Sequence, residues 1–259
     1  MNVNILSNIA NLSYENEETF RSKIIKYTKP NDIHFFDASV NGFSDAQMYT
    51  LEYDNSIVFS IRGTSNIHDI LTDIYTYKKL FHDIQFCNYV DQQKYKNMCV
   101  HSGFLQQYNT VKFNILAHIF KRLWSDQNKQ HHIILTSHSL GAGISVLIAA
   151  TLKAHFGNKV YIENWLFGCP RVGNNAFMNF YNDHVDKTIL YVCGNDIVTR
   201  IPKLGYSHFK NKIILGNPKK ASLCSRIFGT INDHFMDNYI SHINQNNINQ
   251  NNITYNLIN

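Results

Sequence analysis

A serine lies at the centre of the segment best suited to chemistry. The run Thr136–Gly143 places Ser139 between a buried-strand pattern and an apolar helical pattern. A serine at such a strand–turn–helix corner exposes its hydroxyl above the strand ends, and small residues two positions to either side let strand and helix pass closely. Those neighbours are Ser137 and Gly141. Glycine is more usual at the first of these positions, so we expect slight crowding at Ser137. The pattern predicts Ser139 as a nucleophile.

A serine nucleophile needs a base to take its proton and an acid to orient that base. The turn resembles the nucleophile elbow of α/β-hydrolases, in which the acid follows the serine in the chain and the histidine comes last. Of the downstream acids, only Asp196 directly follows a strand pattern, in the run Leu190–Asp196. It would therefore lie at the carboxyl edge of the sheet, where open α/β sheets form their sites. The pattern predicts Asp196 as the acid.

Two histidines are left as candidates for the base. His155 would lie on the helix after the elbow, on the wrong side of the sheet, and His184 precedes Asp196 in the chain. His242 borders a low-complexity segment and is a weak candidate. His208 and His234 both satisfy the expected order, and their spacing alone does not separate them.

The elements needed to position these residues follow from hydrophobic periodicity. Short apolar runs alternate with segments of helical spacing, which predicts a mostly parallel sheet with helices on both faces. We therefore expect an α/β-hydrolase fold, with one domain over residues 1–242 and an Asn-rich tail over residues 243–259 that contains eight Asn. The expected strands are Tyr49–Tyr53, Ile57–Ile61, His132–Thr136, Val160–Phe167 and Thr188–Val192, and the expected helices are Ser102–Trp124 and Ile144–His155.

Composition argues against several other classes of protein. The 259 residues carry a formal net charge of +5, and the basic residues are scattered among acids, with the densest group at Lys210, Lys212, Lys219 and Lys220. We interpret this group as solvated surface. Because no zinc spacing, phosphate-binding loop or RNA-binding signature accompanies the charge, we expect no nucleic-acid partner. Neither a metal nor an organic cofactor is implied.

The first residues and the cysteines bear on location. Met1–Phe20 lacks the basic start and apolar run of a signal peptide, and no run of apolar residues approaches the length of a membrane span. The odd number of cysteines, five, argues against a disulfide framework. We therefore expect an intracellular, reduced protein, with export by another route left open.

Several motifs, taken in order, resemble the class 3 lipase family, which includes fungal triacylglycerol lipases and plant phospholipase A1 enzymes. They resemble its oxyanion loop, the helix start before the elbow, the elbow, the F-G-x-P-R-V-G-N signature and the N-D-x-V acid loop. Together they cover roughly residues 45–240. The matching segments are Ile61–Thr64, His101–Phe104, Thr136–Gly143, Phe167–Asn174 and Asn195–Val198.

The resemblance also implies roles for individual residues. Asp233–Tyr239 is similar to the family's catalytic H-x-x-x-x-Y stretch, whereas the surroundings of His208 are similar to a non-catalytic position. The resemblance therefore selects His234 as the base. It also implies that Thr64 and the Leu140 N–H stabilise the oxyanion. Fixed donors at that position are worth about 3 kcal/mol each.

After Thr64, the segment Ser65–Tyr75 corresponds to the mobile lid of fungal members. Its residues Ile67, Ile70, Leu71 and Ile74 would share one face of a short helix. Packing of that face on the core is the alternative interpretation.

The expected activity is hydrolysis of lipid esters, as in a triacylglycerol lipase, through an acyl-enzyme intermediate. The expected partners are an ester substrate and, transiently, a membrane or lipid-droplet surface. Phospholipase A1, small-ester esterase or acyltransferase activity are alternatives within enzymes. A non-catalytic, lipase-like binding module is the alternative outside them.

Overall fold

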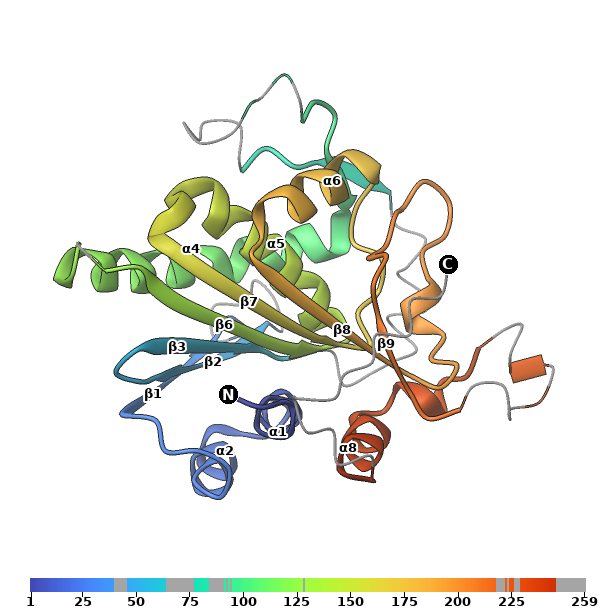
Figure 1. Ribbon diagram of the computed structural model, residues 1–259, viewed down its shortest axis with the longest axis horizontal. Coiled ribbons are helices and arrows are strands. Elements are labelled where there is room, and N and C mark those ends of the chain that lie inside the picture. Colours follow the sequence, from blue (N-terminus) through green and yellow to red (C-terminus); the bar gives the residue numbers. More distant parts are fainter. Residues whose placement is uncertain are drawn as a thin grey trace.

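A seven-stranded, mostly parallel sheet organises the computed structural model, which describes residues 1–39, 46–63, 77–83, 91, 93, 95–127, 129–217, 222, 224–225 and 229–245. The strand order is β1-β2-β3-β6-β7-β8-β9 (Figure 1). The three strands at one edge pair antiparallel, and all pairs from β3 to β9 are parallel. The strands are β1 Asp32–Asp37, β2 Gln47–Glu52, β3 Ser56–Ile61, β6 His131–His138, β7 Val160–Phe167, β8 Lys187–Cys193 and β9 Ile213–Leu215.

Helices cover both faces of this sheet, which confirms the expected fold class (Figure 1). On one face lie α4 (Ser102–Ser125), α5 (Leu140–Phe156) and α6 (Asn175–His184). On the other lie α1 (Val3–Leu12), α2 (Glu17–Ile24) and α8 (Met236–Gln245). A small second sheet pairs β4 (Lys78–Leu80) with β5 (Cys99–His101), and three short 3₁₀ turns are η2 Gly157–Lys159, η3 Val198–Arg200 and η5 Asn232–His234.

Alternating side chains of the central strands supply two separate cores. In β6, Ile133 and Leu135 pack with α4 and α5, whereas Ile134 packs with α1 and α8 on the opposite face. Because both faces are buried, the central strands read as nearly continuous apolar runs. This is why each expected strand was located to within a few residues.

The elements that the sequence patterns missed lie mainly in Asn-rich or short segments. They are α1, α2, β1, β4, β5, α6, β9 and α8. Asparagine was used to predict the tail over residues 243–259, yet the side chains of Asn2, Asn16 and Asn174 accept backbone N–H bonds and cap α1, α2 and α6. An N-cap is a position that favours asparagine. The sequence patterns therefore missed three helices whose first residues follow an asparagine cap.

Two expectations need correction: where the tail begins, and that no run of apolar residues approaches the length of a membrane span. The tail was expected to begin at Ile243, but α8 continues to Gln245 and Ile243 is fully buried, so the packed chain extends three residues further. Leu140–Lys159 is long and apolar enough to span a membrane by length and composition, and 83% of its most apolar window is buried inside the fold. Such burial is that of a core helix. Residues 246–259 lie outside the described part of the chain, and the single-domain organisation stays a prediction.

Candidate active site

The turn around Ser139 has the strained geometry of a nucleophile elbow. β6 ends at His138, α5 begins at Leu140, and Ser139 between them has φ 58° and ψ −126°. A non-glycine residue with positive φ is uncommon and marks strain that the surrounding structure must hold. A Cβ at Gly141 would come 2.2 Å from the Ile61 carbonyl oxygen, so this position requires glycine.

Serine at position 137 takes part in the turn. Its Oγ accepts a hydrogen bond from the Ile61 N–H at 3.2 Å, which links β6 to the neighbouring strand β3. The hydroxyl that replaces the more usual glycine is therefore fully buried but has a partner. This satisfies a polar group that would otherwise be costly to bury.

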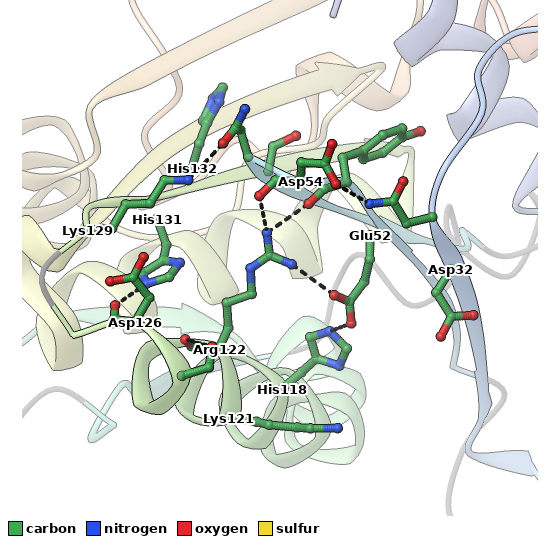
Figure 2. A pocket seen from close by; sticks show the side chains of 15 residues that line it. Asp32, Glu52, Asp54, His118, Lys121, Arg122, Asp126, Lys129, His131 and His132 are labelled. Atoms are coloured by element: carbon green, nitrogen blue, oxygen red, sulfur yellow. Dashed lines mark hydrogen bonds and ion pairs between the residues drawn. The ribbon is translucent and has the colours of Figure 1, made fainter.

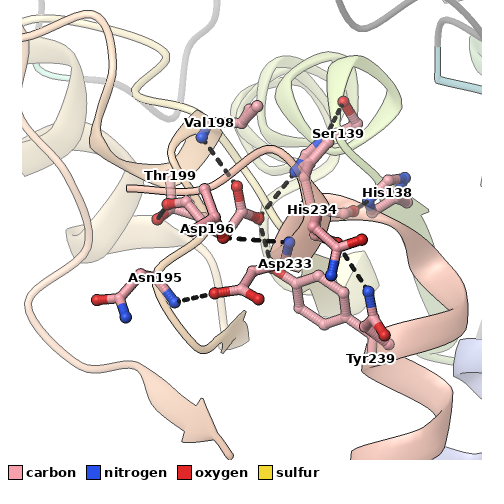
Figure 3. Close-up of polar contacts among 12 residues, drawn as sticks. His138, Ser139, Asn195, Asp196, Val198, Thr199, Asp233, His234 and Tyr239 are labelled. Atoms are coloured by element: carbon pink, nitrogen blue, oxygen red, sulfur yellow. Dashed lines mark hydrogen bonds and ion pairs between the residues drawn. The ribbon is translucent and has the colours of Figure 1, made fainter. Parts of the chain in front are cut away.

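Three side chains that are distant in the sequence meet above the strand ends (Figure 3). His234 Nε2 lies 2.7 Å from Ser139 Oγ, and His234 Nδ1 lies 2.8 Å from Asp196 Oδ2. All three residues are buried. Because the carboxylate only accepts, Nδ1 must carry the proton, and Nε2 is left to accept the serine proton. The structure thus brings together the three residues expected from sequence.

Asp196 is held by two further donors, one of which sequence reasoning missed. The Val198 N–H donates to Asp196 Oδ1 at 2.8 Å, and the Tyr239 hydroxyl donates to Oδ2 at 2.6 Å. Burial, together with the Asp196 charge, raises the pKa of Tyr239 well above its ordinary value, so this phenol stays protonated as a donor. The tyrosine of the H-x-x-x-x-Y stretch was the available signal.

The loops that carry the acid and the base are joined by hydrogen bonds. The Asn195 N–H donates to Asp233 Oδ2 at 2.7 Å, and the Thr230 N–H donates to the Asn195 carbonyl at 2.8 Å. Asp233 directly precedes His234, which ends the 3₁₀ turn η5. The position of the base is therefore fixed against the end of β8, where Asp196 follows.

A glycine makes room for the acid–base pair. Gly168 has φ +60°, and a Cβ there would lie 2.9 Å from Asp196 Oδ2 and 3.0 Å from His234 Cε1. The glycine of the F-G-x-P-R stretch thus has a direct physical reason. Any side chain at this position would press on the hydrogen bond between the acid and the base.

His138 forms a second buried connection to the base. The Tyr14 hydroxyl lies 2.7 Å from His138 Nδ1, and His138 Nε2 lies 2.8 Å from the His234 carbonyl oxygen. Burial, and secondarily the nearby His234, lower the pKa of His138 well below its ordinary value, so the ring is neutral. Because Nε2 must donate to the carbonyl, Nδ1 accepts from Tyr14. No spacing in the sequence links residues 14, 138 and 234.

The other candidate base occupies a different environment. The His208 ring is partly buried, and its removal from solvent, with nearby Arg171 and Lys212, lowers its pKa to about 3. Among the described residues, His208 Nε2 has no hydrogen-bond partner. The ring that reaches Ser139 is that of His234, as the family resemblance had implied.

The expected oxyanion donors are only partly described. Leu140 is the first residue of α5, and the N–H groups of a first helical turn have no acceptors within the helix. Its place next to Ser139 suits oxyanion binding. Thr64 and the possible lid Ser65–Tyr75 lie outside the described residues.

Cys193 needs no chemical role, because its burial raises the pKa of the thiol to about 12.

The fold, together with the arrangement of Ser139, Asp196 and His234, is that of an α/β-hydrolase with a serine nucleophile. The model of the family "Lipase (class 3)" matches residues 58–206. The chain therefore belongs to the class 3 lipase family, and the resemblance seen in the motifs is confirmed. Among solved structures, lipase II from Rhizopus niveus is similar with a TM-score of 0.71 and 21% identity, covering 90% of this chain and 92% of that one. At this identity the likeness supports the fold.

Curated relatives match the chain over part of their length. The secreted mono- and diacylglycerol lipase 1 of Fusarium solani is 29% identical over 154 residues, covering 59% of this chain and 41% of the relative. The secreted mono- and diacylglycerol lipase MDL3 of Malassezia globosa is 30% identical over 165 residues, covering 61% and 51%. Phospholipase A1-II 1 of Oryza sativa subsp. indica is 29% identical over 138 residues, covering 48% and 35%. The chain spans about half the length of these relatives or less.

The expectation of an intracellular location is wrong by this comparison. Six of the similar curated proteins are named as secreted lipases. Met1–Phe20, on whose composition that expectation rested, contains α1 (Val3–Leu12), which packs on the core. The four described cysteines, Cys99, Cys169, Cys193 and Cys224, have free thiols.

Proposed function

We propose that this protein is a serine hydrolase that cleaves carboxylic esters of lipids. The observation that carries the proposal is the single imidazole of His234, which lies within hydrogen-bond distance of both the Ser139 hydroxyl and the Asp196 carboxylate. This geometry makes an ordinary alcohol a strong nucleophile. It also argues against the binding-module alternative, which would tolerate a broken triad.

The proposed reaction is an acyl-enzyme cycle. His234 takes the proton of Ser139 as Oγ attacks the ester carbonyl, and Asp196 stabilises the imidazolium that forms. The tetrahedral oxyanion accepts hydrogen bonds from the Leu140 N–H and from Thr64. His234 then protonates the leaving alcohol, and a water molecule repeats the sequence to release the fatty acid.

Acylglycerols are the proposed substrates. The names of the Fusarium and Malassezia relatives, mono- and diacylglycerol lipases, support a neutral glyceride and an extracellular place of action. The rice relative, a phospholipase A1, supports phospholipid as the second candidate. Transient contact with a membrane or lipid-droplet surface stays a prediction.

An active-site fluorophosphonate probe tests the proposal. The probe reacts with a serine only when a base activates it, so the native chain should be labelled and the Ser139→Ala variant should not. Ser22→Ala, which alters an exposed serine on α2, is the matched control and should label like the native chain. Labelling that persists in Ser139→Ala would contradict the assignment, and absence of labelling in the native chain would favour a binding module.

Substrate class is tested with a panel. Release of fatty acid is compared for diacylglycerol and triacylglycerol emulsions, phospholipid vesicles and a short p-nitrophenyl ester. Preference for the glycerides supports the proposal. Faster release from vesicles would select the phospholipase alternative, and turnover of the short ester alone would select an esterase.

A further inference from the structure

A second group of histidine and carboxylate side chains lies at the opposite edge of the sheet. It comprises His34 on β1, Glu52 at the end of β2 and His118 on α4. His118 Nε2 lies 2.8 Å from Glu52 Oε1, and His34 Nε2 lies 3.4 Å from the same oxygen. One donor atom from each residue lies within 4.8 Å of those of the other two. The three residues thus place two nitrogen donors and one oxygen donor in a single group.

Sheet register and helix packing bring these residues together. Asp32 of β1 is opposite Glu52 of β2, and because side chains alternate along a strand, His34 shares the face of Asp32 and Glu52. α4 covers that face, and the His118 ring packs edge-on against Phe59 of β3, with ring centroids 5.9 Å apart. The group is therefore built by rigid elements rather than by a loop.

Glu52 is already oriented by its second oxygen. Arg122 Nη1 donates to Glu52 Oε2 at 2.9 Å, and its Nη2 donates to the carbonyls of Tyr53 and Asp54 at 2.8 and 2.9 Å (Figure 2). This arrangement leaves Oε1 directed at the histidines. Carboxylates that bind metal ions in proteins are usually oriented by such a hydrogen-bonded partner.

The donor set matches the chemistry of zinc. Two imidazole nitrogens and one carboxylate oxygen form a His₂Glu set, which zinc binds with an open fourth position. Ligand atoms about 2.1 Å from a tetrahedral ion lie about 3.4 Å from one another. The His34–Glu52 distance has this value, the His118–Glu52 distance would have to lengthen from 2.8 Å, and the donor atoms of the two histidines lie within 4.8 Å of each other.

A polar cavity of about 520 Å³ adjoins the group (Figure 2). Glu52 and His118 line it together with Asp32, Lys121 and Arg122. Asp32 Oδ2 lies 3.4 Å from His34 Nε2 and adds negative charge beside the cations Lys121 and Arg122. The cavity gives an ion access from solvent and leaves room for water or an anionic group at the fourth position.

We propose that His34, Glu52 and His118 bind a zinc ion. The ion ties the edge strands β1 and β2 to α4, so it stabilises the folded chain because the unfolded chain lacks the preformed site. This site is separate from the serine hydrolase proposal, since it lies at the amino ends of the parallel strands and Ser139 lies beyond the carboxyl end of β6.

Zinc titration of the full chain after treatment with EDTA tests the site. Calorimetry should show one zinc per chain, and saturating zinc should raise the melting temperature. His34→Gln and His118→Gln should each weaken zinc binding by at least about 10- to 100-fold, the loss that follows when a residue hydrogen-bonded to a metal ligand is removed. His132→Gln is the matched control, because His132 lines the same cavity but lies outside the group. His34 is half exposed, so its variant should fold even where the His118 variant does not.

Cobalt gives an independent readout. Co²⁺ at this site should give the visible absorption of a four-coordinate ion in the native chain and not in His34→Gln. Zinc binding that is absent in the native chain, or that is unchanged in both variants, overturns the proposal. Loss of binding in His132→Gln, or in His234→Gln at the opposite edge, also overturns it by placing the ion elsewhere.

Discussion

The two edges of the sheet use the same side-chain types in different physical settings. At the carboxyl edge, Asp196 and His234 are almost completely buried, and the carboxylate accepts hydrogen bonds from three donors. At the amino edge, Glu52 and His118 are about a quarter and a fifth exposed, and half-exposed His34 completes the group. Histidine with carboxylate is thus not by itself a catalytic signature.

The difference lies in what the histidine nitrogen faces. His234 Nε2 faces the hydroxyl of a strained serine at the start of a helix, so a proton can pass to a fixed base. His118 Nε2 faces a carboxylate oxygen, and its ring lies edge-on to a second histidine. The histidine–serine arrangement is suited to nucleophilic catalysis, and the histidine–carboxylate arrangement is suited to binding a metal ion. Three perturbations should separate the two edges.

The largest effect is expected from changing the acid to its amide. Asp196→Asn can donate to His234 Nδ1 and so stabilise the tautomer whose Nε2 cannot accept from Ser139, and kcat should fall by about 10⁴. The measurement is ester hydrolysis under saturating substrate. Asp54→Asn, the same change at the amino edge, should leave kcat within about twofold, as surface substitutions usually do. Equal losses in both variants would mean that Asp196 acts only through stability.

Acid stability should report the histidines that folding keeps neutral. The pKa of His208 is about 3 in the folded chain and that of an unfolded histidine is about 6.5, so below pH 6.5 only the unfolded state gains the proton. The contribution of His208 is complete above that pH. It is lost as pH falls, at about 1.4 kcal/mol of unfolding free energy per pH unit.

Urea unfolding at several pH values measures this slope. His208→Gln should flatten it, whereas His82→Gln, which alters an exposed histidine, should not. The acid sensitivity that remains should come in part from His138 at the carboxyl edge, whose pKa burial also lowers. A His208→Gln variant with the native slope would be inconsistent with a neutral ring at position 208.

The smallest effect is expected from removing the second donor to the acid. Tyr239→Phe leaves Asp196 Oδ2 bonded to His234 alone. Because a hydrogen bond to a charged group is worth about 1.5 to 3 kcal/mol, kcat should fall about tenfold. KM should change little. The less stabilised carboxylate should hold the protonated imidazole more firmly. The acid limb of the kcat/KM profile should therefore move to higher pH. Tyr161→Phe is the control, and a profile that does not move would limit Tyr239 to packing.

Local patterns were sufficient for the central elements and for the elbow. The apolar run of β6, the small residues around Ser139 and the apolar helix after them are contiguous in the chain, so their periodicity is visible in the sequence. The edge elements were missed because α1 and β1 are Asn-rich or half-exposed. The choice of His234 over His208 needed the family resemblance, since both follow the acid in the chain.

The sequence by itself determined the α/β pattern, the serine at its sharpest turn and the acid after a buried strand, because each is encoded by neighbours within a few residues. Only the tertiary structure decided that Tyr239 supports Asp196, that Tyr14 and His138 hold the backbone of His234, and that His34, Glu52 and His118 face one another. Such contacts depend on strand register and on which helix crosses which face. Those are properties of the packed chain, in which residues separated by dozens of positions come within a few ångströms.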